Sequence, residues 1–264
     1  MRTLGIDAQA ITARYVNVSG ERMNLKVCSD CHMEQTDYFL YSILGFADPV
    51  SSWTHLIGSG VALVMGIRLC LHFQGPALHK TGLITFVSGT VFMFSMSGVY
   101  HILDHDSSGR YVLQHLDHAA IWVMIAGTFT PIHLMLFQGW KRWGILFFIW
   151  AAAINGIVLK TVFFDDFSEW FSLILYLGMG WAGIFSGILI AREHSMISMH
   201  LLAYGGIAYS VGAIIEFLRS PIIIPGVLGP HELFHFAIII GVMCHWRFIE
   251  HTILMSTAEI TESE

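Results

Sequence analysis

Two histidines four residues apart open the last long hydrophobic stretch of the chain. The pentapeptide His231-Glu232-Leu233-Phe234-His235 begins an apolar run from Pro230 to about Leu254. On a helix, residues four apart share a face about one turn from each other, which is the spacing of a pair of metal ligands. Because imidazoles facing hydrocarbon are costly, we expect both rings to face the interior of a helix bundle. The spelling H-E-x-x-H is also that of zinc proteases, so that interpretation stays open.

A second polar group surrounds the connection between two earlier hydrophobic stretches. Ser97 and His101 lie four residues apart near the end of one stretch, and Asp117 is expected about one turn inside the next. A carboxylate at that depth in a bilayer is costly unless it is paired, and the helix dipole offsets only about 0.3 to 1 kcal/mol. We therefore expect Asp117 to have a partner.

The composition is that of a membrane protein. Of 264 residues, 55% are hydrophobic and only 12% are charged, well below the charged fraction of a soluble domain. Seven runs are long enough to cross a bilayer: residues 53–74, 81–104, 113–137, 143–163, 168–191, 199–219 and 230–254. They predict an all-α, polytopic fold with seven transmembrane helices in one bundle. The net charge of −6 offers no basic surface for nucleic acid.

The transmembrane domain is expected over residues 48–255, between a polar N-terminal segment, 1–47, and an acidic tail, 256–264. The aromatic stretch from Tyr38 to Phe46 is too short to span a bilayer, so we expect an interfacial helix there. The N-terminal segment also contains Cys28-Ser29-Asp30-Cys31-His32, which matches the haem-attachment pattern. A single copy without an export signal is weak evidence, and incidental metal binding or no role is the better interpretation.

The polar residues should meet at one depth. In an up-and-down bundle, the end of the second helix and the starts of the third and seventh helices all lie at the membrane face that carries the N-terminus. Ser97, His101, Asp117, His231 and His235 would then gather about a turn from that face. Three neutral imidazoles and a water complete a tetrahedral catalytic zinc site. Asp117 would serve as general base to the water or as an outer partner of the site, and Ser97 would hydrogen-bond Asp117 or an oxyanion.

Other histidines and one glutamate have simpler interpretations. His55, near the start of the first span, is an interfacial or packed histidine and an accessory candidate for the site. Glu216 most simply pairs with Arg219, and His133 and His200 are expected to be packed or interfacial.

The residues described so far resemble the superfamily of haemolysin III, the adiponectin receptors and the progestin receptors, over about residues 48–250. The resemblance lies in Trp53-Thr54-His55-Leu56, Ser97-x-x-x-His101, Leu116-Asp117, Gly127-Thr128-Phe129-Thr130-Pro131 and His231-x-x-x-His235 with the later His245. It implies a zinc ion held by His101, His231 and His235, with Asp117 beside a zinc-bound water and Ser97 nearby. Glu232 departs from the adiponectin receptors, and a second carboxylate in the water shell would follow. Residues 1–46 match nothing recognised in the family.

The family's receptor members resemble ceramidases. The leading hypothesis is therefore an integral-membrane zinc hydrolase of a lipid amide such as ceramide, with Asp117 and Ser97 catalytic. The alternatives are a receptor or membrane-stress sensor with a structural zinc, or a cytolysin, although no secretion signal or soluble amphipathic spanning segment is apparent.

Two further classes are less favoured. An intramembrane protease would use Glu232 as its base, but the chain lacks the Asp-Gly pair such proteases use. A retinal protein would need a Schiff-base lysine in the seventh helix, and the last lysine is Lys160.

The expected location is the cell membrane, as a multi-pass protein. Lysine and arginine near the spans favour an external N-terminus, whereas the family's receptors place theirs in the cytoplasm, and we adopt the family arrangement. The substrate and the oligomeric state stay open.

Overall fold

The computed structural model describes residues 12–16, 22–26, 40–194 and 199–262. The chain divides into two units, residues 1–39 and 40–264. In the first unit, β1 (Thr12–Val16) pairs with β2 (Arg22–Lys26) as an antiparallel hairpin with Thr12 opposite Lys26. The sequence analysis did not predict this hairpin. The Cys28-x-x-Cys31-His32 pattern lies outside the described residues.

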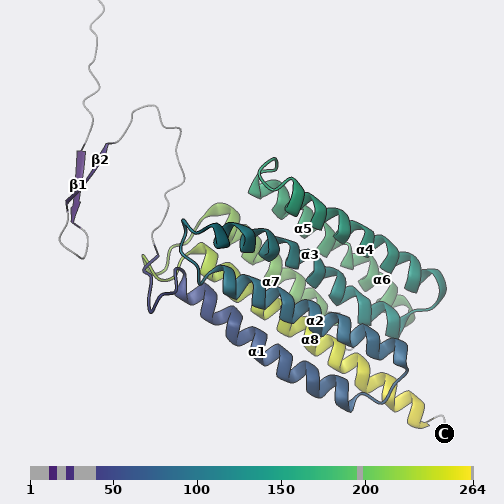
Figure 1. Ribbon diagram of the computed structural model, residues 1–264. Coiled ribbons are helices and arrows are strands. Elements are labelled where there is room, and N and C mark those ends of the chain that lie inside the picture. Colours follow the sequence, from purple (N-terminus) through teal and green to yellow (C-terminus); the bar gives the residue numbers. More distant parts are fainter. Residues whose placement is uncertain (1–11, 17–21, 27–39, 195–198, 263–264) are drawn as a thin grey trace, which may run out of the picture. The chain divides into compact units, whose positions relative to one another are not determined.

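The second unit is a bundle of helices (Figure 1). Its helices are α1 (Pro49–His72), α2 (Ala77–Tyr100), α3 (Ser108–Leu136), α4 (Gly139–Val162), α5 (Glu169–Trp181), α6 (Gly183–Glu193), α7 (Met199–Leu218) and α8 (Pro230–Glu262). Seven segments of the described chain are long and apolar enough to cross a membrane, with α5 and α6 together forming one of them. The predicted all-α membrane fold with seven spanning helices is confirmed.

Helix ends differ from the hydropathy-based bounds by a few residues. α1 begins at Pro49, a residue suited to the first turn of a helix, and Ser107 caps α3 by accepting from the main-chain N–H of Arg110 at 3.2 Å. α2 ends at Tyr100, four residues before the hydropathy-based bound, so His101 lies just past its end. Asp117 lies about two and a half turns inside α3, not one. Windows of hydropathy find apolar runs, whereas caps decide where helices begin.

The segment before α1 is a turn. Ile43 and Phe46 exchange hydrogen bonds of 3.2 and 3.0 Å, and the intervening Leu44 and Gly45 have positive φ. Over residues 40–46, the interfacial helix expected from the aromatic composition is therefore not formed. Tyr38 and Phe39 lie outside the described residues.

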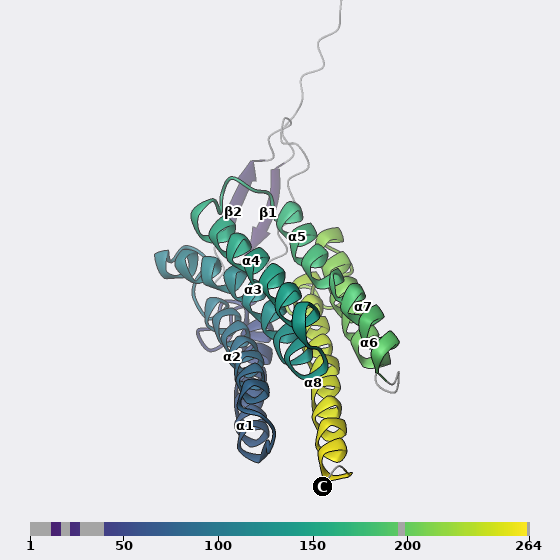
Figure 2. The same cartoon turned by 90° about the vertical axis from the view of Figure 1, so that its right-hand side faces the viewer.

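α8 is the helix around which the site is built. It packs against α1, α3 and α7 (Figures 1 and 2). Its Trp246 meets Phe86 of α2 with ring centroids 5.2 Å apart, in a core shared by α2, α3 and α8. The rest of α8 continues as helix to Glu262, through most of the residues that the sequence analysis assigned to an acidic tail.

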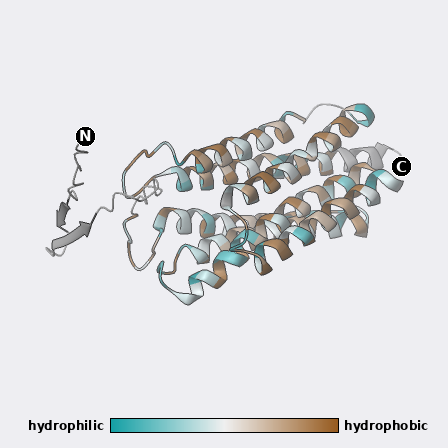
Figure 3. Ribbon diagram, turned by 90° about the horizontal axis from the view of Figure 1, so that it is seen from above, coloured by the Kyte–Doolittle hydropathy of each residue, from teal (hydrophilic) through white to brown (hydrophobic). Residues whose placement is uncertain are grey.

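α2 and α3 approach closely because glycines line their crossing. A Cβ on Gly89 would lie 3.3 Å from the Val123 carbonyl oxygen, and a Cβ on Gly127 would lie 3.3 Å from the Thr85 carbonyl oxygen. Along the helices hydrophobic residues predominate, and hydrophilic stretches lie mainly near the helix ends (Figure 3). The close α2–α3 contact holds the end of α2, and with it His101, beside the first turns of α3.

Candidate metal centre

Three imidazoles converge at one end of the bundle. The Nε2 atom of His231 lies 3.1 Å from Nε2 of His101 and 3.1 Å from Nε2 of His235. His101 and His235 are buried, and His231 is half-buried. This is a cluster that could hold a metal ion, and the structure builds it from the residue after α2 and the first two turns of α8.

The local sequence explains how α8 presents its pair. Pro230 occupies the first position of the helix, where its missing N–H is no loss. His231 and His235 follow one turn apart on the face turned toward α1 and α2, and the His235 ring stacks on His55 of α1.

Carboxylates hold the outer nitrogens of two of the three rings. Nδ1 of His101 lies 2.8 Å from Oδ2 of Asp48, whose side chain is almost fully buried, and Nδ1 of His231 lies 3.3 Å from Oε1 of Glu216. Each carboxylate also pairs with an arginine: Arg110 donates to Asp48 Oδ2 at 2.6 Å, and Arg219 pairs with Glu216. The sequence interpretation of Glu216 was therefore incomplete, since it contacts His231 as well as Arg219.

Asp48 is held in its ionised form. Burial by itself would raise its pKa, but the hydrogen bond and charge of His101, together with those of Arg110, hold the pKa of this carboxyl well below its usual range. An ionised carboxylate can only accept, so His101 donates its Nδ1–H to Asp48.

This donation fixes what faces the centre of the cluster. With the proton on Nδ1, the Nε2 atom of neutral His101 carries a lone pair, and the same holds for His231 where it donates to Glu216. Two lone pairs 3.1 Å apart repel unless a proton or a metal ion lies between them. The donor set therefore fits a metal ion. On tetrahedral zinc, two nitrogen ligands would be about 3.3 Å apart, close to the spacing observed here.

The third ring, that of His235, is held differently. Its plane stacks on the ring of His55 with centroids 3.8 Å apart and an angle of 15° between the planes. His55 is buried, and in the described part of the chain neither of its ring nitrogens has a hydrogen-bond partner. The accessory candidate His55 thus lies against the cluster without being one of the three converging rings.

Ser97 and Asp117 lie beside the cluster. Ser97, in the last turn of α2, is buried, and its hydroxyl interacts with the Asp117 carboxyl. Asp117 also lies near enough to His101 and His231 for its charge to act on both rings. The partner that Asp117 needed is therefore provided by Ser97 and the imidazoles together. A carboxylate next to three imidazoles can accept a proton from a water bound among them.

Glu232 has a structural task. One of its oxygens accepts from the Ser51 hydroxyl of α1 at 3.0 Å, and the other accepts from the main-chain N–H of Gly229 at 2.9 Å. It caps the start of α8 and ties that helix to α1. Each oxygen therefore has a hydrogen-bond partner in the scaffold, and the hypotheses of a second carboxylate in the water shell or of a protease base stay predictions.

Sequence reasoning missed Asp48 as a partner of the site. The available signal was an acidic residue directly before the proline that starts the first span, a position more often occupied by a helix cap. Asp48 makes no side-chain cap here. Its partner His101 is 53 residues away, so only the folded chain reveals the contact.

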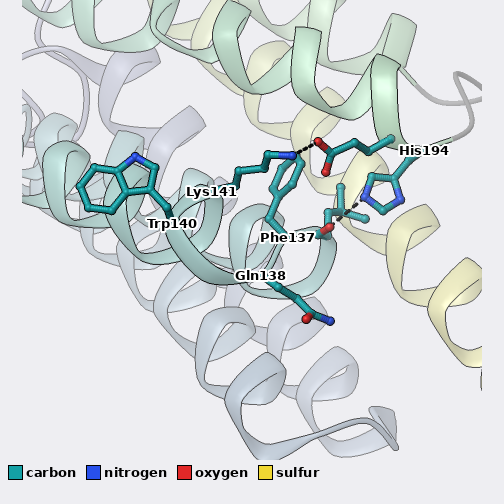
Figure 4. Close-up of a pocket in the computed structure, with 7 residues that line it drawn as sticks. Phe137, Gln138, Trp140, Lys141 and His194 are labelled. Carbon is teal, nitrogen blue, oxygen red and sulfur yellow. Dashed lines mark hydrogen bonds and ion pairs between the residues drawn. The ribbon is translucent and has the colours of Figure 1, made fainter.

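The opposite end of the bundle has a cleft of about 460 Å³ with no comparable cluster among the described residues (Figure 4). Lys141 pairs there with Glu193, and His194 Nε2 lies 2.8 Å from the Leu136 carbonyl oxygen. Nearby, buried His133 donates from Nδ1 to the Lys141 carbonyl at 2.9 Å, which confirms that it is a packed histidine.

The fold and the cluster define a multi-pass membrane protein with a three-histidine site near one end of its seven-helix bundle. The chain belongs to the haemolysin III family: the family model described as Haemolysin-III related matches residues 46–246. This places it in the haemolysin III and adiponectin receptor superfamily, as the sequence resemblance indicated.

Individual relatives agree with this assignment. The chain is 33% identical to Hemolysin-3 of Bacillus cereus over 166 residues, which cover 61% of this chain and 74% of the relative. It is 37% identical to the Hemolysin-3 homolog of Bacillus subtilis over 164 residues, covering 61% and 76%. It is 28% identical to the ADIPOR-like receptor IZH2 of Saccharomyces cerevisiae over 181 residues, covering 61% and 56%.

The cluster predicts about one tightly bound divalent metal ion per chain. Replacing His101 with alanine removes one of three nitrogen donors and should lower the metal content of purified protein by more than half. Elemental mass spectrometry of the detergent-purified protein measures this. His72→Ala, at an exposed position at the end of α1, is the matched control and should keep the wild-type content. Equal metal content in wild type and His101→Ala would show that the three rings do not act as one site.

The capping role of Glu232 predicts that Glu232→Gln lowers stability and keeps the metal. Loss of a charged acceptor for Ser51 and Gly229 should cost about 1 to 2 kcal/mol, seen as a lower thermal midpoint in detergent. Metal content should stay at the wild-type level. A variant with unchanged stability and reduced metal would instead place Glu232 within the centre.

Proposed function

We propose that this protein is an integral-membrane, zinc-dependent hydrolase of a lipid amide, ceramide-like in class. The observation that carries the proposal is the position of Asp117 and Ser97 beside three converging imidazole nitrogens. Three histidines with an open fourth position are the donor set of catalytic zinc, whereas structural zinc sites are usually closed by four protein ligands. When bound, zinc would supply Lewis-acid polarisation of the amide carbonyl and lower the pKa of a water.

The protein residues would manage the protons. The Asp117 carboxylate takes one proton from the attacking water as the water oxygen bonds to the amide carbon. When the carbon–nitrogen bond breaks, Asp117 returns the proton to the departing nitrogen, so the products are a fatty acid and an amine. Ser97 holds Asp117 through its hydroxyl, which keeps the carboxylate beside His101 and His231.

A membrane lipid is the natural substrate for a site in this position. The ligands lie at and just inside the ends of membrane-spanning helices, close to where the amide of a bilayer sphingolipid would be. Large apolar side chains such as Ile57 and Val61 of α1 are exposed on the described surface, so the bundle meets lipid directly. Lipid would reach the centre by passing between helices.

A receptor or sensor with a structural metal is the second candidate function. What favours it is the name of the yeast relative, an ADIPOR-like receptor. The name of the bacterial relatives, hemolysin-3, suggests cytolysis as another function in the same way. Neither function requires turnover of a lipid, so a hydrolysis assay separates them from the leading proposal.

Hydrolysis of a fluorescent ceramide in detergent–lipid micelles should depend on Asp117. Asp117→Ala removes the proton acceptor and should lower the turnover rate by about 100-fold or more, within the range of general acid–base catalysis, while metal content is retained. Asp106→Asn, an exposed carboxylate in the loop before α3, is the matched control and should keep the wild-type rate. A metal-loaded wild type without turnover would favour the receptor function.

We also propose that the protein lies in the cell membrane with its N-terminus, and hence the metal centre, at the cytoplasmic face. In a background with all four native cysteines replaced, Asp106→Cys should react with a permeant maleimide and resist an impermeant one added to intact cells. Asp106 is exposed in the loop between α2 and α3, close to His101. Labelling by the impermeant reagent would reverse the orientation.

A further inference from the structure

The three candidate ligands are not held equally by the backbone. His231 and His235 lie on α8, whose helical geometry sets the relative direction of their side chains. His101 is the C-cap of α2: its main-chain N–H still donates to the Ser97 carbonyl at 3.1 Å, but the helix does not continue past it. Tertiary contacts supply the rest of the support for its ring.

Those contacts converge on Asp48. The main-chain N–H groups of Ala47 and Asp48 donate to the carbonyls of Ile102 and His101 at 3.1 and 3.0 Å, so the start of α1 is joined to the turn after α2. The same Asp48 then receives the ring N–H of His101 on Oδ2 at 2.8 Å. Main chain and side chain together therefore fix both the place and the rotation of the His101 ring.

Arg110 fastens the other side of this turn. Its guanidinium donates to Asp48 Oδ2 at 2.6 Å and to the Leu103 carbonyl at 2.5 Å, and it lies over the Tyr100 ring at 4.4 Å from the centroid. Arg110 is itself buried. One carboxylate oxygen thus joins the first turns of α1 and α3 to the imidazole at the end of α2.

We infer that Asp48, supported by Arg110, is the positioning residue that makes His101 a metal ligand. It directs the His101 Nε2 lone pair at the other two rings and keeps the ring from rotating. The inference rests on the metal-centre part of the proposed function and is independent of the reaction catalysed. Carboxylates that hydrogen-bond a ligand imidazole typically account for 10- to 100-fold in metal affinity.

Glu216 and Arg219 repeat the arrangement at His231 in a looser form. The His231–Glu216 distance is 3.3 Å, against 2.8 Å for His101–Asp48, and the Glu216 side chain is 18% exposed, against 4% for Asp48. His231 also has its helix to direct it. The loss of Glu216 should therefore matter less than the loss of Asp48.

The test is zinc affinity, measured by competition with a chelator of known affinity on detergent-purified full-length protein. Asp48→Asn keeps the size of the side chain and removes its charge, and should weaken zinc binding 10- to 100-fold. Glu216→Gln should weaken it less, and Asp106→Asn, the matched exposed control, should stay within about twofold of wild type. The visible spectrum of the cobalt(II)-substituted protein should change in Asp48→Asn, because the geometry of the ligand set changes.

A double-mutant cycle separates positioning from general destabilisation. If Asp48 acts through His101, Asp48→Asn should cause no further loss of affinity in a His101→Ala background. Additive losses, or a folded Asp48→Asn protein with wild-type affinity and spectrum, would overturn the inference. If Asp48→Asn does not fold, zinc affinity is measured in Arg110→Lys instead. Unchanged zinc affinity in that variant would overturn the positioning role of the Asp48–Arg110 pair. A wild type that binds no zinc would instead overturn the metal centre itself.

Discussion

The hydrogen bond between His101 and the buried Asp48 carboxylate is the interaction on which this site depends. The outer nitrogen of His101 is committed to an ionised Asp48, which leaves its inner nitrogen facing His231 at 3.1 Å. A proton or a metal ion between these nitrogens would relieve the repulsion between their lone pairs. The carboxylates of Asp48 and Glu216 place negative charge behind the rings of His101 and His231. The three rings could hold a metal ion, and binding of such an ion would be coupled to the stability of the helix ends.

The bundle supplies this geometry through a few tight contacts. Gly89 and Gly127 let α2 and α3 approach, which places the end of α2 beside Asp117. Glu232 joins the start of α8 to Ser51 of α1, and Asp48 joins the start of α1 to the end of α2. These contacts link the ends of three helices around the three rings. A site that depends on helix ends needs such ties, because helix termini otherwise fray.

The range matched by the haemolysin III family model contains the whole candidate site. The family model matches residues 46–246, which begins just before Asp48 and includes every residue placed at the centre. Residues 12–16 and 22–26, with their hairpin, lie outside that range. The relatives include both hemolysins and a receptor-like protein by name, so the family name does not distinguish lipid hydrolysis from sensing. The choice rests on whether Asp117 and Ser97 act on a bound lipid.

The sequence by itself determined the seven spans, the shared face of His231 and His235, and the end of the bundle where the polar residues meet. Each of these follows from a local property: the length of an apolar run, the period of a helix, or the alternation of helix direction. The tertiary structure decided which side chains surround the three histidines of the cluster. It placed His101 beyond its helix, assigned Glu232 to a cap, and brought Asp48 to His101 from 53 residues away and Glu216 to His231 across the α7–α8 connection. A hydropathy pattern records which residues avoid water, but not which distant carboxylate will meet a given imidazole. That pairing is settled only when the helices pack.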